Sequence, residues 1–167
     1  MTIEVLLPDE AATNRAGAAL AGALGAGDAV LLFGDLGAGK SALARAAIRA
    51  LLAEDGREDE DIPSPSFALV QVYDAPRAEI WHADLHRLSG PEGCVELGLE
   101  DAFEGALCFV EWPERLGPLT PARRLELRLD FGPEGRGRLL RAAAVGPGWE
   151  RAMAALAGLG AGCGGKA

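Results

Sequence analysis

The stretch VLLFGDLGAGKS, residues 30–41, decides the fold of this chain. It begins with four apolar residues, which are typical of a buried strand, and continues as G-x-x-x-x-G-K-S into an alanine-rich segment with helix-forming composition. A strand, a glycine-rich loop and a helix in this order predict a P-loop, which binds phosphate groups. The loop glycines at positions 34, 37 and 39 allow a tight turn that brings backbone N–H groups near an anion.

The basic residue of this motif is Lys40, a lysine in a chain whose basic residues are mostly arginines. Arginine supplies all but two of the 16 basic residues, and one of the two lysines is Lys40. The compact ammonium of Lys40 can reach the terminal phosphates of a nucleotide, and the hydroxyl of Ser41 can bind Mg²⁺. The residues predicted to hold the nucleotide in this loop are Asp35, Leu36, Gly37, Ala38, Gly39, Lys40 and Ser41.

Composition limits the other possibilities. The chain has 167 residues, enough for one domain with a substantial core, and a net charge of −9 with a pI near 4.7. This acidity argues against tight, direct binding of nucleic acid, and we expect no direct sequence-specific DNA binding. We also expect no signal peptide and no membrane segment, because the sequence has no basic leader and no long apolar run. The cysteines Cys94, Cys108 and Cys163 form no C-x-x-C pair, which favours a reduced, cytoplasmic compartment.

Hydrophobic periodicity predicts an α/β fold. Strands are predicted at Thr2–Leu7, Ala29–Phe33, Phe67–Tyr73, Glu79–Ala83, Ala106–Val110, Arg124–Asp130 and Arg138–Val145. Helices are predicted at Glu10–Leu24, Ser41–Leu52 and Trp149–Leu156, with a short helix or turn within Gly90–Leu99. The expected architecture is a single P-loop NTPase-like domain over residues 1–157. It has a mixed central sheet flanked by helices, a hairpin of the third and fourth strands, and a late antiparallel strand pair. The glycine-rich residues 158–167 are predicted to form a flexible tail, and the acidic run 54–61 a solvated, mobile loop.

Two carboxylates follow predicted strands and are candidates to complete a phosphate site. Glu111 ends the apolar strand 106–110, and Asp84 follows the strand 79–83. Either carboxylate could hold Mg²⁺, directly or through water, or orient an attacking water molecule. Acids at strand ends also serve as helix caps and turn residues, so the pattern leaves both interpretations open.

Other polar and aromatic residues lie near these acids in the sequence. Ser66, in the Ser64–Phe67 turn, is placed where switch-containing NTPases present a hydroxyl to the metal or the γ-phosphate, although proline-rich turns also occur without function. His82 and His86 flank Asp84, but His82 is expected in a strand, so hydrogen bonding is favoured over a zinc site. Trp112 either packs the sheet edge or forms a wall of the phosphate site.

Four motifs in order resemble those of the bacterial tRNA threonylcarbamoyladenosine biosynthesis ATPase family, TsaE. They are Gly34–Ser41, Ser64–Phe67, HADLHRL at 82–88 and VEWPE at 110–114, and the resemblance covers about residues 5–145. It implies a small P-loop ATPase that binds ATP or ADP with Mg²⁺ and works with the partner proteins TsaB and TsaD. Together these proteins install threonylcarbamoyl on adenosine 37 of tRNA, which is therefore an indirect partner. In the family, TsaD performs the transfer and ATP hydrolysis supports repeated turnover.

The resemblance also implies roles for individual residues. Ser41 and Glu111 would bind Mg²⁺, and Lys40 would contact phosphate. Asp84 would be a catalytic or water-positioning acid, so the implied catalytic set is Asp84, Glu111 and Lys40.

Further positions are carried over with differences from the family. Glu10 and Arg136 fall where the family contacts the nucleotide. Ser41 and Ser66 replace the usual threonines and keep the hydroxyl, so metal binding and switch chemistry are both expected to be kept. His86 stands where the family usually has tyrosine.

Alternative functions remain for a P-loop chain of this size. A stand-alone small-molecule kinase is the main alternative, but the acidic loop and proline-rich turn after the P-loop helix are too small for an obvious lid. A GTPase switch would need an N-K-x-D motif, which the sequence does not contain. A nucleotide sensor without turnover is disfavoured by the acids Glu111 and Asp84. We expect hydrolysis by the isolated protein to be slow, because the motifs contain no obvious arginine finger.

Overall fold

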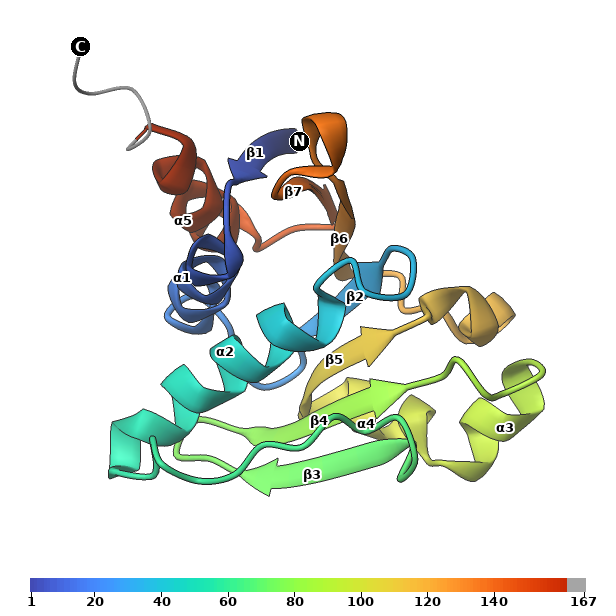
Figure 1. Cartoon of the computed structure of the whole chain (residues 1–167). Coiled ribbons are helices and arrows are strands. Elements are labelled where there is room, and N and C mark those ends of the chain that lie inside the picture. Colours follow the sequence, from blue (N-terminus) through green and yellow to red (C-terminus); the bar gives the residue numbers. More distant parts are fainter. Residues whose placement is uncertain (162–167) are drawn as a thin grey trace, which may run out of the picture.

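The structure, a computed structural model, describes residues 1–161 and has a central sheet with helices on both faces (Figure 1). The strands are β1 (Thr2–Leu7), β2 (Ala29–Phe33), β3 (Val70–Asp74), β4 (Glu79–Asp84), β5 (Leu107–Glu111), β6 (Arg124–Phe131) and β7 (Arg138–Val145). The helices are α1 (Glu10–Ala21), α2 (Lys40–Leu52), α3 (Pro91–Glu96), α4 (Leu99–Gly105) and α5 (Glu150–Ala161), with 3₁₀ segments η1 (Ala53–Asp55), η2 (Pro113–Leu119) and η3 (Pro133–Gly135). Residues 162–167, part of the tail predicted to be flexible, lie outside the described residues.

Within residues 1–161, seven strands form one mixed sheet in the order β1-β7-β6-β2-β5-β4-β3. The centre is parallel, because β2 runs parallel to both β5 and β6, and β4 runs parallel to β5. The antiparallel pairs are β1 with β7, β6 with β7, and β3 with β4. The predicted mixed sheet, late antiparallel pair and β3–β4 hairpin are confirmed. The parallel strands β2, β4 and β5 bring the P-loop, Asp84 and Glu111 to the same edge of the sheet.

Apolar layers cover both faces of the central strands. Val30 and Leu32 of β2 belong to the core beneath α1, α2 and α5, whereas Leu31 belongs to the core beneath α3, α4 and η2. This alternation follows the two-residue period of a strand, and burial of both faces explains why β2 is a continuous apolar run. The strand that carries the P-loop is therefore held from both sides.

Several element boundaries differ from the sequence prediction. β3 begins at Val70 rather than Phe67, because the Leu69 N–H donates to the Pro65 oxygen at 2.7 Å and closes a turn. An additional short helix, α4, follows α3 after Gly98, whose φ of 81° separates the two. α1 ends at residue 21 rather than 24, and α5 continues to residue 161 rather than 156.

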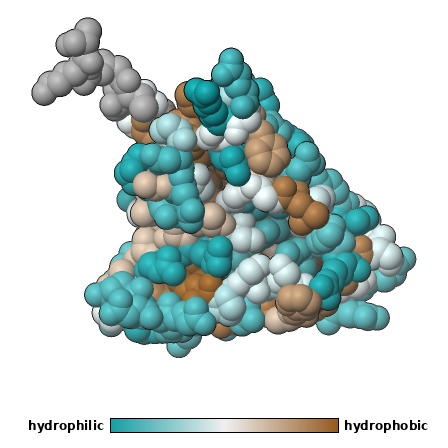
Figure 2. Space-filling model, in the orientation of Figure 1, coloured by the Kyte–Doolittle hydropathy of each residue, from teal (hydrophilic) through white to brown (hydrophobic). Residues whose placement is uncertain are grey.

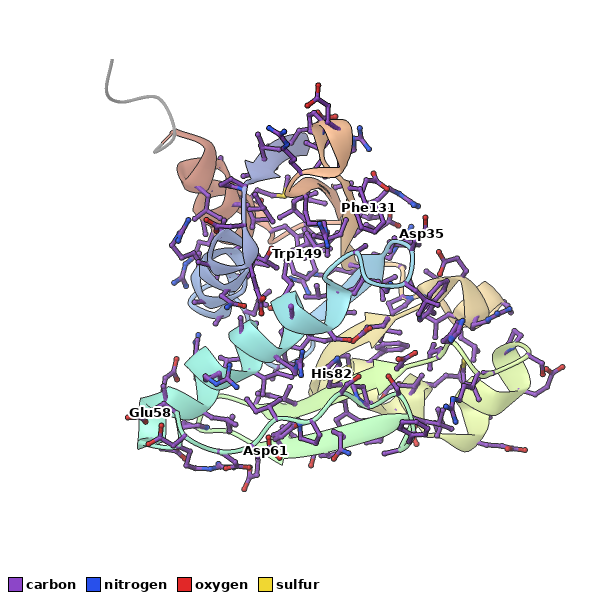
Figure 3. All side chains as sticks on the ribbon, in the orientation of Figure 1. Asp35, Glu58, Asp61, His82, Phe131 and Trp149 are labelled. Atoms are coloured by element: carbon purple, nitrogen blue, oxygen red, sulfur yellow. The ribbon has the colours of Figure 1, made fainter. Side chains whose placement is uncertain are left out.

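The molecular surface is mostly hydrophilic on the face shown in Figure 2, where apolar colour is confined to separate patches. The acidic run 54–61 is largely exposed, and Glu58 and Asp61 lie at the periphery of the molecule (Figure 3). No helix within residues 1–161 combines the length and the apolar character that a membrane crossing requires.

Two of the three cysteines are buried in the described part of the chain. Cys94 and Cys108 are free thiols. Burial raises the pKa of Cys108 to about 12, so this thiol stays protonated at neutral pH and is a poor nucleophile. Cys163 lies outside the described residues.

Gly17 allows α1 and α2 to pack closely together. A Cβ atom at this position would overlap the Leu43 carbonyl oxygen and would lie 2.8 Å from the Ala46 Cβ. We expect Gly17→Ala to lower the free energy of unfolding by about 1–3 kcal/mol, because one helix must shift to make room. Urea denaturation measures this loss.

Gly22, at the end of the same helix, provides the matched control. The nearest heavy atom to a Cβ there is the Ala19 oxygen at 3.8 Å, an ordinary contact. We expect Gly22→Ala to change the free energy of unfolding by less than about 0.5 kcal/mol. Equal losses of unfolding free energy in the two variants would show that the close packing of α1 on α2 does not depend on Gly17.

Candidate nucleotide-binding site

The P-loop connects the end of β2 to the start of α2. Its backbone is left-handed at Gly37, with φ of 77°, and at Gly39, with φ of 106°, conformations that favour glycine. Gly39 caps α2 without any side-chain hydrogen bond, so a capping side chain does not cover the first N–H groups of the helix. These N–H groups, together with the positive end of the helix dipole, form a site suited to a phosphate anion.

Lys40 lies at the first position of α2 and is almost completely buried, with 4% of its surface exposed. Its Nζ donates to the carbonyl oxygens of Gly34 at 2.6 Å and Asp35 at 2.8 Å, and lies 4.6 Å from the centre of the Trp112 ring. Burial lowers the pKa of the Lys40 ammonium, an effect opposed by the nearby carboxylates, of which Glu111 acts most strongly. The ammonium is thus held by the loop that would surround the phosphates.

Ser41 and Glu111 meet at the base of this loop. The Ser41 hydroxyl lies 2.8 Å from Oε1 and 2.9 Å from Oε2 of Glu111, and the Glu111 side chain is buried at the end of β5. Mg²⁺ prefers oxygen ligands and commonly takes one or two from a protein and the others from phosphates and water. A hydroxyl and a carboxylate beside a phosphate-binding loop therefore fit this ion.

Asp84 lies beside Glu111 because the two residues are paired in the parallel β4–β5 register. Its Oδ2 accepts a hydrogen bond from the Ser66 hydroxyl at 3.2 Å, and its Oδ1 accepts one from the His86 N–H at 3.0 Å. The Ser64 hydroxyl lies 2.9 Å from that of Ser66. The proline-rich turn is therefore tied to this carboxylate, which fixes the orientation of Asp84 at the edge of the sheet.

Two cavities flank the P-loop and share Gly37, Gly39 and Ala42. One, of about 250 Å³, is lined by Leu36, Lys40, Ser41, Arg45, Ser66, Asp84, Glu111 and Trp112 in addition to the shared residues. The other, of about 350 Å³, is lined by Pro8, Asp9, Glu10, Thr13, Gly137 and Arg138 in addition to them. The first cavity contains groups suited to phosphates and a metal, and the second leaves room for the remainder of a nucleotide.

A larger cavity, of about 430 Å³, lies over β1, β6 and β7 and is lined by residues such as Phe33, Arg128 and Arg141. None of the predicted site residues lines it. Arg141 is already paired there with Glu4 and Asp130. Size alone therefore does not identify the functional site of this chain.

The part of the chain that contains these cavities matches a known protein family. The model of the family described as threonylcarbamoyl adenosine biosynthesis protein TsaE matches residues 7–138. The chain belongs to the TsaE family. The matched segment runs from the end of β1 to the start of β7 and includes the lining residues of both cavities beside the P-loop.

Individual TsaE relatives cover most of the chain. The tRNA threonylcarbamoyladenosine biosynthesis protein TsaE of Rickettsia bellii is 39% identical over 126 residues, which are 75% of this chain and 85% of that protein. The protein of the same description from Nostoc sp. is 35% identical over 144 residues, 81% of this chain and 85% of its own length. The crystal structure of YdiB from Bacillus subtilis is similar with a TM-score of 0.73 at 22% identity, covering 95% of this chain and 94% of that one. This likeness confirms the P-loop NTPase-like α/β fold.

Most of the site residues predicted from the TsaE resemblance lie together. Lys40, Ser41, Ser66, Asp84 and Glu111 surround the smaller cavity, with Leu36, Gly37 and Gly39 of the loop. Glu10 lines the cavity of about 350 Å³ on the other side of the P-loop. Ala38 is buried beneath the loop, whereas Asp35 is exposed at its tip (Figure 3) and contributes its carbonyl oxygen to Lys40.

Two further predicted residues, Arg136 and Trp112, differ in whether they line a cavity beside the P-loop of this TsaE chain. Arg136 is exposed at the end of η3 and lines neither cavity beside the P-loop. Trp112 lines the smaller cavity, with its backbone left-handed at φ of 57°, so it contributes a wall of the site. The ring of His86 lies 4.5 Å from the Trp112 ring, measured between the ring centres.

Arg138 is a site residue that sequence reasoning missed. Its guanidinium donates to the carbonyl oxygens of Ala38 at 2.9 Å and Gly37 at 3.0 Å. Its side chain lines the cavity of about 350 Å³ beside the P-loop, which Glu10 also lines. This position arises because β6 pairs with both β2 and β7, which brings the start of β7 to the edge of the sheet where β2 ends. Nothing local in the sequence indicates that β6 pairs with β2.

The contrast between Arg138 and Arg136 gives a direct test within the TsaE site. We expect Arg138→Ala to weaken ADP binding about 10-fold, because it removes charge-assisted hydrogen bonds that hold the loop. Arg136→Ala is the matched control and is expected to change ADP affinity less than about twofold. Isothermal titration with ADP measures both variants. A larger loss in Arg136→Ala would assign the nucleotide contact to Arg136, as the family resemblance implies.

Proposed function

We propose that this chain is the ATP-hydrolysing subunit of the machinery that installs threonylcarbamoyl on adenosine 37 of tRNA. In this proposal it binds ATP with Mg²⁺ and supports repeated turnover of the TsaB–TsaD transferase. The observation that carries the proposal is the Ser41–Glu111 contact beside Lys40, in a chain whose relatives are named for threonylcarbamoyladenosine biosynthesis. That contact joins a P-loop hydroxyl to a strand-end carboxylate, the arrangement that a metal-assisted phosphate reaction requires.

The residues divide the chemical work of ATP hydrolysis. The loop N–H groups and the Lys40 ammonium would bind the phosphates and stabilise the negative charge that develops on them. Ser41 and Glu111 would hold Mg²⁺, which neutralises phosphate charge when it is bound. The buried carboxylate of Asp84, fixed by Ser66 and the His86 N–H, is oriented to position the attacking water molecule.

The same geometry supports slow hydrolysis by the isolated chain. Within residues 1–161, Arg45 is the arginine that lines the phosphate-side cavity, as we name the cavity of about 250 Å³ that contains Lys40 and Ser41. Its Nε donates to the Ser41 carbonyl oxygen at 3.3 Å. Because this contact directs the guanidinium toward its own helix, we do not expect Arg45 to act as an arginine finger in the isolated chain. The missing charge stabilisation is then expected to come from a partner or from a rearrangement that a partner induces.

Steady-state ATP hydrolysis tests the partner dependence. We expect a slow rate for the isolated chain and a rise of at least several-fold when TsaB and TsaD are added together. A phosphate-release assay with each component alone and in combination measures this effect. Equal rates with and without the TsaB–TsaD pair would remove the partner from the proposal. Phosphorylation of a small metabolite in the same assay would support the stand-alone kinase.

A further inference from the structure

His82 is a fully buried polar residue directly behind the phosphate site. It lies at the centre of the molecule on β4 (Figure 3), two residues before Asp84, so both side chains lie on the same face of the strand. Its Nε2 is 2.8 Å from Oε1 of Glu111. Glu111 is therefore contacted by Ser41 from the P-loop side and by His82 from the sheet.

The hydrogen-bonding inventory of the ring fixes the direction of this contact. A carboxylate that serves as a metal ligand accepts hydrogen bonds, so in the proposed site the proton between the two groups belongs to Nε2 of His82. The other ring nitrogen, Nδ1, is buried and has no hydrogen-bond partner in the part of the chain that the structure describes. The bond to Glu111 is thus the polar interaction that this ring makes.

A buried imidazole with one unpaired nitrogen stabilises the fold less than an apolar side chain of similar volume would. Packing alone therefore does not account for a histidine here. Glu111, by contrast, needs a fixed orientation, because its flexible side chain lies close enough to the Lys40 ammonium to be the strongest charge acting on it. Lys40 instead donates to Gly34 and Asp35, and Glu111 remains with Ser41 and His82.

We infer that His82 is a positioning residue for Glu111: its Nε2–H holds Oε1 and keeps the carboxylate turned toward Ser41 rather than toward Lys40. This inference rests on the proposed function, because it takes Glu111 as the residue that holds Mg²⁺. Hydrogen-bond partners behind metal ligands of this kind typically change metal affinity about 10- to 100-fold. His82 would thus act on the metal through Glu111 without touching the nucleotide.

Two substitutions separate this role from packing. His82→Leu introduces an apolar side chain of similar size and removes the donor. His82→Gln restores an N–H donor at similar reach from the backbone. A purely structural histidine predicts that both variants change stability without a selective effect on Mg²⁺, whereas a positioning histidine predicts that glutamine rescues what leucine loses.

The experiment measures ADP affinity by calorimetry in excess Mg²⁺ and again in EDTA. We expect Mg²⁺ to strengthen ADP binding by the wild-type chain. In His82→Leu this gain in affinity is expected to be smaller by a factor of at least about 10. In His82→Gln the gain is expected to stay within about threefold of the wild-type value. Affinity in EDTA is expected to change less than about twofold in both variants. Wild-type strengthening retained in a folded His82→Leu variant would overturn the inference. No strengthening in the wild type would instead overturn the proposed metal site.

A second measurement uses the wild-type chain and needs no variant at position 82. The sequence has two histidines, so nitrogen-15 NMR resolves their ring tautomers, and His86→Phe assigns the signals. We expect a slowly exchanging proton on Nε2 of the His82 ring. A proton on Nδ1 with a bare Nε2 would overturn the inference whether or not His82→Leu folds.

Discussion

Replacing Lys40 with alanine is expected to lower the rate of ATP hydrolysis by at least about 100-fold, a loss typical of removing one charge-stabilising group from a reaction centre. The Lys40 Nζ is the buried cationic group of the phosphate-side cavity, and the loop holds it through the carbonyl oxygens of Gly34 and Asp35. These oxygens lie in a loop that water can reach, so the fold is expected to survive. Circular dichroism and phosphate release, measured on the same preparation, separate the two effects.

The variant Lys40→Arg sharpens this test. It keeps the positive charge but replaces a compact ammonium by a planar guanidinium, which the carbonyl pair around Nζ does not match. We expect Lys40→Arg to lose most of the activity that Lys40→Ala loses. Wild-type hydrolysis by Lys40→Arg would show that charge alone, rather than the shape of the site, is what the loop supplies.

The second large effect is expected at Glu111. Glu111→Ala removes the carboxylate that accepts hydrogen bonds from Ser41 and His82. We expect the rate of hydrolysis to fall by at least about 100-fold. The same loss is expected in the wild-type chain when EDTA removes Mg²⁺. Hydrolysis by Glu111→Ala is expected to respond little to added Mg²⁺. Measuring the rate of hydrolysis over a range of Mg²⁺ concentrations tests both the loss of rate and the weak response to Mg²⁺.

Glu114 provides the control for charge near the loop. It is exposed, lies three residues after Glu111, and adds to the negative field at Lys40 without lining the cavity. Glu114→Ala is therefore expected to change the rate less than about threefold. Hydrolysis at the wild-type rate by Glu111→Ala would place the metal anchor on another residue, with Asp84 the first to examine.

The strands, loop and helix around this site that the sequence predicts are encoded locally. The P-loop carries its own strand, turn glycines and helix in one continuous stretch, and Glu111 and Asp84 each end a recognisable strand. Hydrogen bonding by His82 was also predicted and is confirmed, since it follows from a polar residue on the inward face of a strand. Its partner Glu111 was not identified, because that requires the register between β4 and β5.

The parts that sequence analysis missed depend on contacts distant in the chain or on weak local signals. Arg138 reaches the P-loop because β6 lies between β2 and β7, so the start of β7 is near the end of β2. The helix α4 buries only Leu99 and Ala102, too few apolar positions to give a clear period. The turn that delays β3 depends on a left-handed backbone at Leu69, a conformation that a leucine gives no reason to expect.

The central proposal is tested most directly by reconstituted tRNA modification. Unmodified tRNA, TsaB, TsaD and a threonylcarbamoyl donor are combined with ATP, with and without this chain, and threonylcarbamoyladenosine is counted per molecule of TsaD. We predict many rounds of modification only when both the chain and hydrolysable ATP are present, and no gain from Lys40→Ala over the reaction that lacks the chain. The same number of rounds with and without the chain would contradict the proposal.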